Sequence, residues 1–247
     1  MMERRTTGWA PREETVSHPG RCGNKKPRRS TEPCKTMGKD VNGGEYFERV
    51  APQWDQMRQR FFSENVRAVV YDTANVQPGK LAADIGAGTG FITEGLLRKG
   101  LRVIAVDLSE AMLEELRKKF GDFNAVDCRA GESAHLPIAD AAVDYVFANM
   151  YLHHVEKPSD ALREMARVLR TGGKVVITDL DEHCHEFLRA EHHDRWMGFK
   201  REDVRLWFEK AGLRNARVDC VGENCCATSG FGAGSAAVGI FIASGEK

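Results

Sequence analysis

A glycine-rich run with an acidic residue downstream is the strongest chemical signal in the sequence. The run Asp84–Gly90 has glycine at every second position from Gly86, directly after an apolar stretch, and Asp107 closes the next apolar stretch. Glycine lets a backbone turn sharply and approach a ligand closely, and the helix predicted after the run has an N-terminus that favours anionic groups. An acid about 20 residues beyond such a loop can accept hydrogen bonds from both hydroxyls of a ribose. The two features together predict a site for a cofactor of the nucleotide type.

Spacing distinguishes between two cofactors that such a site can hold. A dinucleotide fingerprint has a third glycine where the helix packs closely on the strand. This sequence has Phe91 at that position. The bulky ring argues against a bound pyrophosphate, so the sequence favours S-adenosylmethionine (SAM) over NAD.

The elements that must position these residues alternate between strands and helices. The predicted strands are 80–85, 101–106, 124–128, 143–148 and 173–179, followed by 217–221 and 237–243, and the predicted helices are 90–99, 109–119, 159–170 and 201–210. Alternation of this kind predicts a parallel sheet. Ser109 is the predicted N-cap of its helix, Gly121 the predicted end, and Gly172-Gly173 the predicted turn into the fifth strand.

Four segments resemble the serial motifs of the class I SAM-dependent methyltransferases. They are Asp84–Gly90, Val106-Asp107, Gly131–Pro137 and Leu169–Gly173. The similarity covers about residues 44–247. It implies an α/β, Rossmann-like, doubly wound sheet of seven strands, mostly parallel with one antiparallel hairpin at the edge. Within the family, the chain is most similar to the small-molecule branch, which includes quinone and arsenite methyltransferases and the methyltransferase domains fused to metalloregulators.

The resemblance also implies a set of cofactor-binding residues. In the family, the segment written here as Gly131-Glu132-Ser133 usually reads Gly-Asp-Ala and its acid meets the adenine amino group, so Glu132 is the match with one extra methylene. Aromatic residues of an N-terminal helical lid, 43–78, resemble those that cover SAM, although aromatic residues at helical spacing are also typical of a core. The expected cofactor-binding residues are Asp84, Gly86, Ala87, Gly88, Thr89, Gly90, Asp107, Leu108, Met112, Glu132, Ser133, Asn149, Tyr46 and Trp54.

The candidate catalytic residues follow the fourth strand. Ligands of open α/β sheets bind beyond the carboxyl ends of the parallel strands, where His153 and His154 lie. Methyl transfer from a sulfonium is an in-line displacement in which positioning and exclusion of water matter most, and an imidazole can serve as general base or positioning group. The alternative for His153 is a packing or capping role beneath its loop. The expected substrate-binding residues are Tyr151, His183, Trp196 and Phe199.

Histidine and cysteine are concentrated in the later loops. Asp181–His185 places Cys184 between two histidines, His192–Trp196 brings two more, and Cys225-Cys226 lies in a predicted loop at 222–235. Thiolates bind soft metals and trivalent arsenic, so these three cysteines are candidate ligands for a metalloid near the methyl donor. The sequence has no Cys-x-x-Cys pair, and vicinal cysteines rarely serve one zinc ion, so no metal ligand is assigned.

Composition limits the organisation and the partners of the chain. It has 247 residues, 42% of them hydrophobic, which suits one α/β domain at 43–247. Residues 1–42 hold four of the eight prolines and ten basic against five acidic residues, and we expect a disordered basic extension there. The remaining 26 basic and 31 acidic residues disfavour nucleic acid as a partner. There is no membrane-spanning apolar run and no secretory signal, and the seven cysteines fit reduced thiols, so we expect a cytoplasmic protein.

The sequence thus predicts an enzyme that moves a methyl group from SAM to a small-molecule acceptor, with a quinone-like or similar organic acceptor favoured. One alternative is methylation of a metalloid or thiol, such as arsenite, through Cys184, Cys225 and Cys226. Another is a non-catalytic SAM- or metal-sensing protein, because a fold alone does not prove turnover. A further one is methylation of a macromolecule guided by the basic extension. The sequence assigns no oligomeric state.

Overall fold

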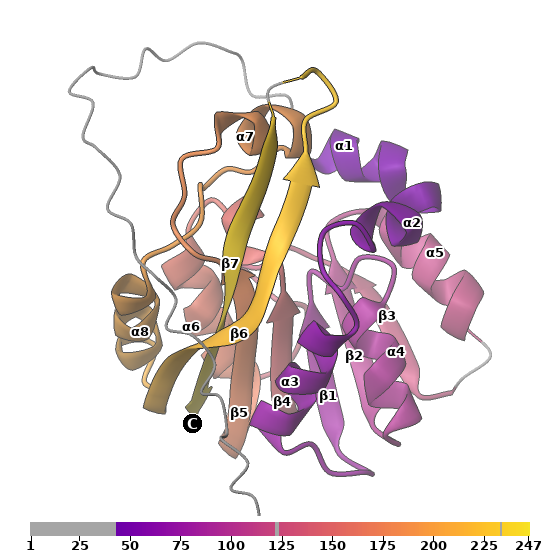
Figure 1. Cartoon of the computed structure of the whole chain (residues 1–247). Coiled ribbons are helices and arrows are strands. Elements are labelled where there is room, and N and C mark those ends of the chain that lie inside the picture. Colours follow the sequence, from indigo (N-terminus) through magenta and orange to yellow (C-terminus); the bar gives the residue numbers. More distant parts are fainter. Residues whose placement is uncertain (1–42, 122–123, 233) are drawn as a thin grey trace, which may run out of the picture. The chain divides into compact units, whose positions relative to one another are not determined.

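A seven-stranded sheet is the framework of the protein (Figure 1). The computed structural model describes residues 43–121, 124–232 and 234–247, so the extension predicted for 1–42 lies outside the described residues. The strand order is β3-β2-β1-β4-β5-β7-β6, in which β1 to β5 pair in parallel and β7 is antiparallel to both β5 and β6. The predicted fold class is confirmed.

The described elements follow one another in the predicted alternation. The strands are β1 (Leu81–Ile85), β2 (Arg102–Asp107), β3 (Val126–Ala130), β4 (Val143–Asn149), β5 (Leu169–Leu180), β6 (Arg214–Thr228) and β7 (Ser235–Glu246). The helices are α1 (Gly43–Val50), α2 (Trp54–Arg58), α3 (Asn65–Ala74), α4 (Phe91–Arg98), α5 (Glu110–Phe120), α6 (Pro158–Val168), α7 (Glu186–His192) and α8 (Arg201–Lys210), with 3₁₀ turns η1 (Ala51–Gln53) and η2 (Leu152–His154). None of the helices in the described ranges has the length and apolarity needed to span a membrane.

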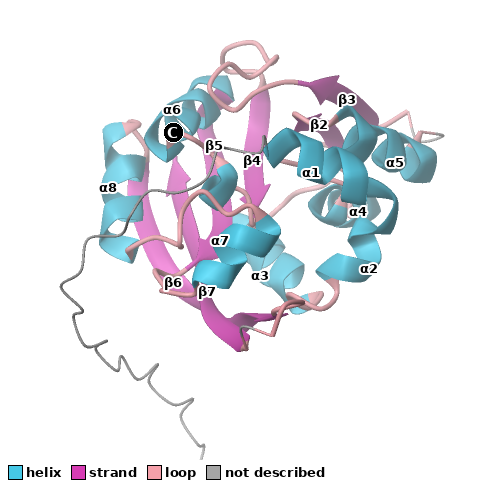
Figure 2. Ribbon diagram, turned by 90° about the horizontal axis from the view of Figure 1, so that it is seen from above, coloured by secondary structure: helices cyan, strands magenta, loops and turns pink. Residues whose placement is uncertain are grey.

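Helices cover both faces of the sheet (Figure 2). On one face, α6 and α8 bury Met165 and Phe208 against the strands. On the other, α3 and α4 bury Val70 and Leu96. Successive side chains of a strand point to opposite faces, so a sheet covered twice needs apolar residues at nearly every position, which is what the runs in β1, β2 and β4 supply. Each fully buried side chain of this kind stabilises the fold by roughly 1.5–3 kcal/mol.

The antiparallel hairpin is longer than the sequence indicates. The strands predicted at 217–221 and 237–243 extend to Arg214–Thr228 and Ser235–Glu246. The predicted loop at 222–235 is therefore wrong for residues 222–228, which belong to β6 and pair with β7 from Asn224 onward. A register irregularity between Cys220 and Asn224 allows β6 to continue past Gly222, which has a φ of 87°. A bulge absorbs an extra residue without ending a strand, so glycine at 222 bends β6 but does not terminate it.

Two other elements differ from expectation. Gly172-Gly173 does not separate α6 from β5, because β5 already begins at Leu169, which pairs with Val143. The segment predicted as a lid, 43–78, divides into two parts. Residues 43–58 pack on α5 through Met112, whereas α3 belongs to the main core together with the strands. Only the first part lies over the carboxyl ends of the strands (Figure 1).

Candidate active site

The loop between β1 and α4 is a glycine cradle. Gly86, Gly88 and Gly90 have φ values of 68°, 53° and 93°, in the left-handed region that L side chains rarely adopt. A Cβ atom at Gly86 would lie 2.1 Å from the ring of Tyr151, so this ring rests directly on the backbone of the loop. At Gly88, the nearest neighbour of a Cβ would be the Trp54 indole at 3.6 Å. The rings of Tyr151 and Trp54 therefore cover the cradle.

Asp107 closes the next strand and binds the cradle. Its Oδ2 accepts a hydrogen bond from the Gly88 amide (2.8 Å), and its Oδ1 accepts one from the Ser109 amide (2.9 Å). Burial raises the pKa of Asp107, although these backbone donors oppose the shift. The Ser109 side chain accepts from the Met112 amide (3.2 Å), which confirms the predicted N-cap of α5. Leu108, which lies between Asp107 and Ser109 in the sequence, is 60% exposed.

Asp84 positions the loop from below. Its carboxylate is 1% exposed and accepts hydrogen bonds from the amide and the hydroxyl of Thr93 in α4 (2.9 and 2.7 Å). Burial raises the pKa of Asp84 to about 7, against the effect of both Thr93 donors. The contact fixes the start of α4 against the end of β1, so the glycine turn between them has little freedom.

The loops after β3 and β4 form the other side of the cradle. Ser133 is buried and contacts the Tyr151 side chain, whereas Glu132 is exposed. Burial raises the pKa of Tyr151 to about 12. Asn149, at the end of β4, accepts a hydrogen bond from the Thr178 hydroxyl (2.7 Å). Its carboxamide is thereby held at the edge of the sheet.

Aromatic residues of the lid reach from the cradle to the histidines. Phe47 contacts Trp54 on one side (ring centroids 5.5 Å apart) and His154 on the other (5.0 Å). Tyr46 packs against His193 (4.7 Å). The lid is tied to the glycine loop by Asp55, which accepts a hydrogen bond from the hydroxyl of Thr89 (2.6 Å) and pairs with Lys119.

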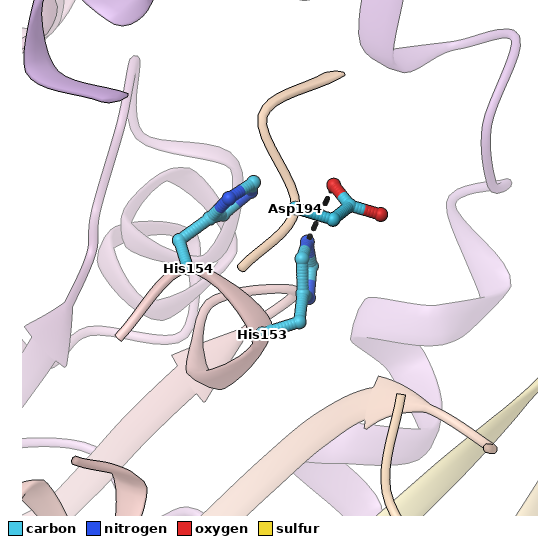
Figure 3. A group of neighbouring side chains, drawn as sticks. All are labelled: His153, His154 and Asp194. Carbon is cyan, nitrogen blue, oxygen red and sulfur yellow. Dashed lines mark ion pairs between the residues drawn. The ribbon is translucent and has the colours of Figure 1, made fainter. Parts of the chain in front are cut away.

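The two histidines after β4 lie in η2 and have different surroundings (Figure 3). His153 is 4% exposed and lies between two carboxylates, with Nδ1 2.7 Å from Asp179 Oδ1 and Nε2 3.8 Å from Asp194 Oδ1. Burial alone would lower the pKa of His153, but Asp179 and Asp194 raise it to about 9. His154 Nδ1 lies 3.3 Å from the carbonyl oxygen of His193. Burial and the charge of His153 hold the pKa of His154 well below its usual value.

A mainly apolar cavity lies between the lid, η2 and the hairpin. Four histidine or aspartate residues line it, together with aromatic residues of the lid and of the segment that follows α2. Its lining residues are Tyr46, Phe47, Trp54, Phe61, Phe62, Met150, His153, His154, Leu180, Leu188, His192, Asp194, Cys225 and Ala227. Because Trp54 borders both this cavity and the glycine cradle, the two sites are neighbours.

The chain is similar to known methyltransferases. Residues 83–177 match the model of a methyltransferase domain. A demethylmenaquinone methyltransferase of Thermobifida fusca (strain YX) is 32% identical over 176 residues, which cover 68% of this chain and 67% of that protein. The chain belongs to the class I SAM-dependent methyltransferases.

Another relative matches the methyltransferase over a smaller share of its length, and a solved structure resembles it in fold alone. A demethylmenaquinone methyltransferase of Renibacterium salmoninarum is 35% identical over 136 residues, 54% of this chain and 56% of that protein, so the match spans only about half of its length. The structure of phosphoethanolamine N-methyltransferase 2 of Haemonchus contortus, in complex with SAM, superposes with a TM-score of 0.67 at 16% identity, covering 84% of this chain and 60% of that one. The latter likeness shows the shared fold.

Two residues predicted to bind the substrate have other places in the methyltransferase. Phe199 is 5% exposed within the core, and its amide donates to the Leu180 carbonyl (2.9 Å). Trp196 is 42% exposed, and its indole donates to the Val155 carbonyl (2.8 Å), which braces the segment after η2. Neither lines the cavity. The apolar segment 196–199 suited either a wall of the pocket or a packing corner, and the structure has these two rings at the core and at the segment after η2.

The remaining substrate candidates lie beside the cavity. Tyr151 rests on Gly86 and thus borders the cofactor cradle. Nε2 of His183 is buried without a hydrogen-bond partner, and burial lowers the pKa of this histidine to about 4. The charge of His153 contributes to that shift, and His183 does not line the cavity.

The cysteine cluster predicted for a metalloid does not form. Cys225 and Cys226 are consecutive residues of β6 and point to opposite faces, so Cys225 is 7% exposed and lines the cavity while Cys226 is exposed to solvent. Cys184 is also exposed. Among the described residues, the group of three or more potential metal ligands within reach of one another consists of His153, His154 and Asp194 and contains no thiol.

Sequence reasoning missed the residues that define the electrostatics of the site. Asp179 follows the apolar run of β5, and its position at the carboxyl end of a parallel strand was a usable signal. His192 ends α7 and Asp194 follows it, in a segment whose path over the sheet was not predictable. Phe61 follows a helix of the lid and carries no motif.

Proposed function

We propose that this methyltransferase transfers the methyl group of SAM to a small, uncharged, planar aromatic acceptor of the quinol type. The observation that carries the proposal is the cavity beside the glycine cradle, which combines the rings of Phe47, Trp54 and Phe61 with the half-buried imidazole of His154. Flat apolar walls suit a planar ring, and a few polar groups fix its orientation.

The residues of the cradle fit SAM. Asp107 accepts hydrogen bonds from backbone amides with both of its oxygens, and two carboxylate oxygens offer about four lone pairs, so acceptor capacity is left for ribose hydroxyls. The backbone at Gly88 is open except toward Trp54, which leaves room for a ligand beneath the lid. Glu132 and Ser133 lie on the side expected for the adenine, and exposed Leu108 supplies an apolar cover.

The buried charges beside the cavity argue against an anionic acceptor. Asp179 and Asp194 are buried beside the cavity, and His153 is the cation that lies between them. Two carboxylates against one imidazolium disfavour a carboxylate or phosphate on the acceptor, because like charges repel strongly where water is excluded. The relatives named demethylmenaquinone methyltransferases support a quinol-like ring as the acceptor.

SAM supplies an electrophilic methyl group on a sulfonium. The chain's own residues must then align the acceptor, exclude water and receive a proton. The Nδ1 of His154 is directed to the His193 carbonyl, so the tautomer that donates there leaves Nε2 unprotonated. We assign this nitrogen the hydroxyl proton of the acceptor, while a ring carbon of the acceptor forms its bond to the methyl carbon and sulfur keeps the electron pair of the broken bond. The hydrogen of that ring carbon then moves as a proton to the oxygen, which restores the hydroxyl and the aromatic ring. S-adenosylhomocysteine is the second product.

His153 has a positioning role in this scheme. Both of its ring nitrogens face carboxylates, and its ring centroid lies 4.0 Å from that of His154. An imidazole held from both ends cannot rotate, so it keeps the neighbouring ring in place. Asp179 also accepts hydrogen bonds from the amides of Tyr151 (3.2 Å) and His153 (3.3 Å), which fixes the backbone that carries all three side chains.

The test is methyl transfer from labelled SAM to a reduced naphthoquinone under anaerobic conditions, followed by mass spectrometry of the product. Wild-type protein should yield a labelled, methylated ring. His154→Gln should lower kcat by about 10²–10⁴ without changing the affinity for SAM, because only the proton acceptor is removed. His135→Ala, at an exposed histidine outside the cavity, is the matched control. SAM binding without transfer to any quinol would overturn the acceptor class, and an unchanged kcat in His154→Gln would overturn the role of that residue.

A further inference from the structure

His153, His154 and Asp194 bring three potential metal ligands to one point at the edge of the cavity (Figure 3). One ligand atom from each residue lies within 4.8 Å of the others. His153 and Asp194 are buried and His154 is half-buried. Two of the residues come from η2 and the third from the segment after α7, so the point is formed only by the tertiary fold.

Both imidazoles have the outer partner that metal-binding histidines require. Nδ1 of His153 faces the Asp179 carboxylate at 2.7 Å, and Nδ1 of His154 faces the His193 carbonyl at 3.3 Å. Histidines that bind metals almost always donate the other ring N–H to a carboxylate or a backbone carbonyl, which selects the tautomer and raises the basicity of the ligand nitrogen. Here the same arrangement leaves Nε2 of each ring for an ion.

Unbalanced charge and an unpaired histidine support the same conclusion. Asp179 and Asp194 are 0% and 5% exposed, and both carboxylates face the same imidazole, at 2.7 Å from Nδ1 and 3.8 Å from Nε2 of His153. A divalent ion with two neutral imidazoles would neutralise both. In addition, both ring nitrogens of His192, which lines the same cavity, are buried without a hydrogen-bond partner. Buried polar atoms of this kind are rare unless a ligand or water satisfies them.

We propose that His153, His154 and Asp194 bind a divalent first-row transition metal ion, with Zn²⁺ as the probe. Two imidazoles and one carboxylate suit zinc and its neighbours rather than Mg²⁺ or Ca²⁺, which prefer oxygen. Bonds of about 2.0–2.2 Å in tetrahedral geometry place ligand atoms roughly 3.3 Å apart. The 3.8 Å between His153 Nε2 and Asp194 Oδ1 must therefore shorten by about half an ångström, and no pair of ligand atoms, all within 4.8 Å of one another, must shorten by more than about 1.5 Å.

The bound ion regulates the site by competition. Zn²⁺ on Nε2 of His154 occupies the nitrogen that receives the acceptor's proton, so the loaded protein should bind SAM but not turn over. This inhibition rests on the proposed function, whereas the binding of the ion does not. Metal binding is therefore measured first, without SAM and without an acceptor.

The experiment is calorimetric titration of the untagged, full-length, reduced protein with Zn²⁺. We expect one strong site per chain in the wild type. Asp194→Asn should weaken this site at least 100-fold because a ligand charge is lost, and Asp179→Asn should weaken it by about 10–100-fold through the outer partner of His153. His135→Ala, at an exposed histidine, should bind Zn²⁺ like the wild type. SAM affinity measured on each variant shows that it is folded.

Cobalt distinguishes this site from adventitious binding to thiols. Co²⁺ in place of Zn²⁺ should give visible ligand-field bands but no thiolate-to-cobalt charge-transfer band, because all ligands are nitrogen or oxygen. A thiolate band, the absence of a strong site, or equal Zn²⁺ affinity in the wild type and in folded Asp194→Asn would each overturn the proposal. Inhibition by Zn²⁺ that persists in Asp194→Asn would place the inhibitory ion elsewhere.

Discussion

The carboxylate of Asp179 fixes the imidazole of His153, with Oδ1 2.7 Å from Nδ1 and both side chains almost fully buried. Asp179 belongs to β5 and His153 to η2 after β4, two strands that are neighbours in the sheet. The pair therefore joins the carboxyl ends of two parallel strands, and its integrity should determine both the stability of the site and the orientation of His154.

Asp179→Asn should lower the free energy of unfolding by on the order of 3 kcal/mol, because it leaves a buried imidazolium with one carboxylate fewer. Urea denaturation measures the loss. Asp181→Asn is the control, since Asp181 pairs with Arg201 at a partly exposed position (2.7 Å) and should cost about 1 kcal/mol or less. Equal losses in the two variants would mean that the buried pair contributes no more than the exposed one.

Asp107→Ala should weaken SAM binding by roughly 1–3 kcal/mol, because hydrogen bonds to a charged acceptor are lost. Isothermal titration calorimetry gives the affinity. Asp127→Ala, at an exposed acid on the neighbouring strand β3 that pairs with Arg129, should leave it unchanged. Unchanged affinity in Asp107→Ala would contradict the assignment of this residue to the ribose.

Gly86→Ala should destabilise the protein more than Gly79→Ala, although both positions have positive φ, of 68° and 78°. The new methyl group would lie 2.1 Å from the Tyr151 ring at position 86, whereas nothing lies within 4 Å at position 79. Gly79→Ala should therefore cost only the backbone strain, about 1 kcal/mol. Thermal unfolding compares the two variants, and Tyr151→Ala should rescue Gly86→Ala in part. The absence of rescue would place the clash elsewhere.

Burial raises the pKa of Asp84 to about 7, which makes stability depend on pH. In the unfolded chain, the pKa of an aspartate is about 3.9. Between pH 4 and 7, the folded state therefore holds a proton that the unfolded state has lost. The contribution of Asp84 to the free energy of unfolding should thus fall as pH rises through this window, by up to about 4 kcal/mol for a shift of roughly 3 pKa units. Above the window it should stay low.

The measurement is urea denaturation at pH 5 and pH 8 of the wild type and of Asp84→Asn, which cannot ionise. The difference in unfolding free energy, wild type minus variant, should be about 2–3 kcal/mol less favourable at pH 8, because the two measurements span roughly 2 of the 3 pKa units. Comparing the two proteins removes the contribution of the other carboxylates, which titrate in both. A difference that does not change with pH would show that Asp84 ionises normally.

Thiol reactivity should separate the two consecutive cysteines. Burial raises the pKa of Cys225 to about 12, whereas Cys226 is exposed. Since the thiolate is the reactive form, iodoacetamide at neutral pH should label Cys226 much faster than Cys225, as peptide mass spectrometry can show. Unfolding in urea should make the two rates similar. Comparable rates in the folded protein would contradict the outward and inward orientations in β6.

The sequence alone was sufficient for the local features of the cofactor site. The glycine run, Asp107 and the N-cap Ser109 could be predicted because each depends on near neighbours along the chain: a turn that needs positive φ, a strand end and the first turn of a helix. The alternation of apolar strands with amphipathic helices was equally local, and it determined the parallel sheet.

Only the tertiary structure decided the acceptor side of the site. Cys225 and Cys226 formed a plausible ligand pair in the sequence, but β6 continues past Gly222, and the period of two in a strand sends their side chains apart. His153, by contrast, acquires its two carboxylates from segments 26 and 41 residues further along, Asp179 in β5 and Asp194 after α7. Such pairings depend on how strands and loops are placed in space, and spacing along the chain carries no information about them.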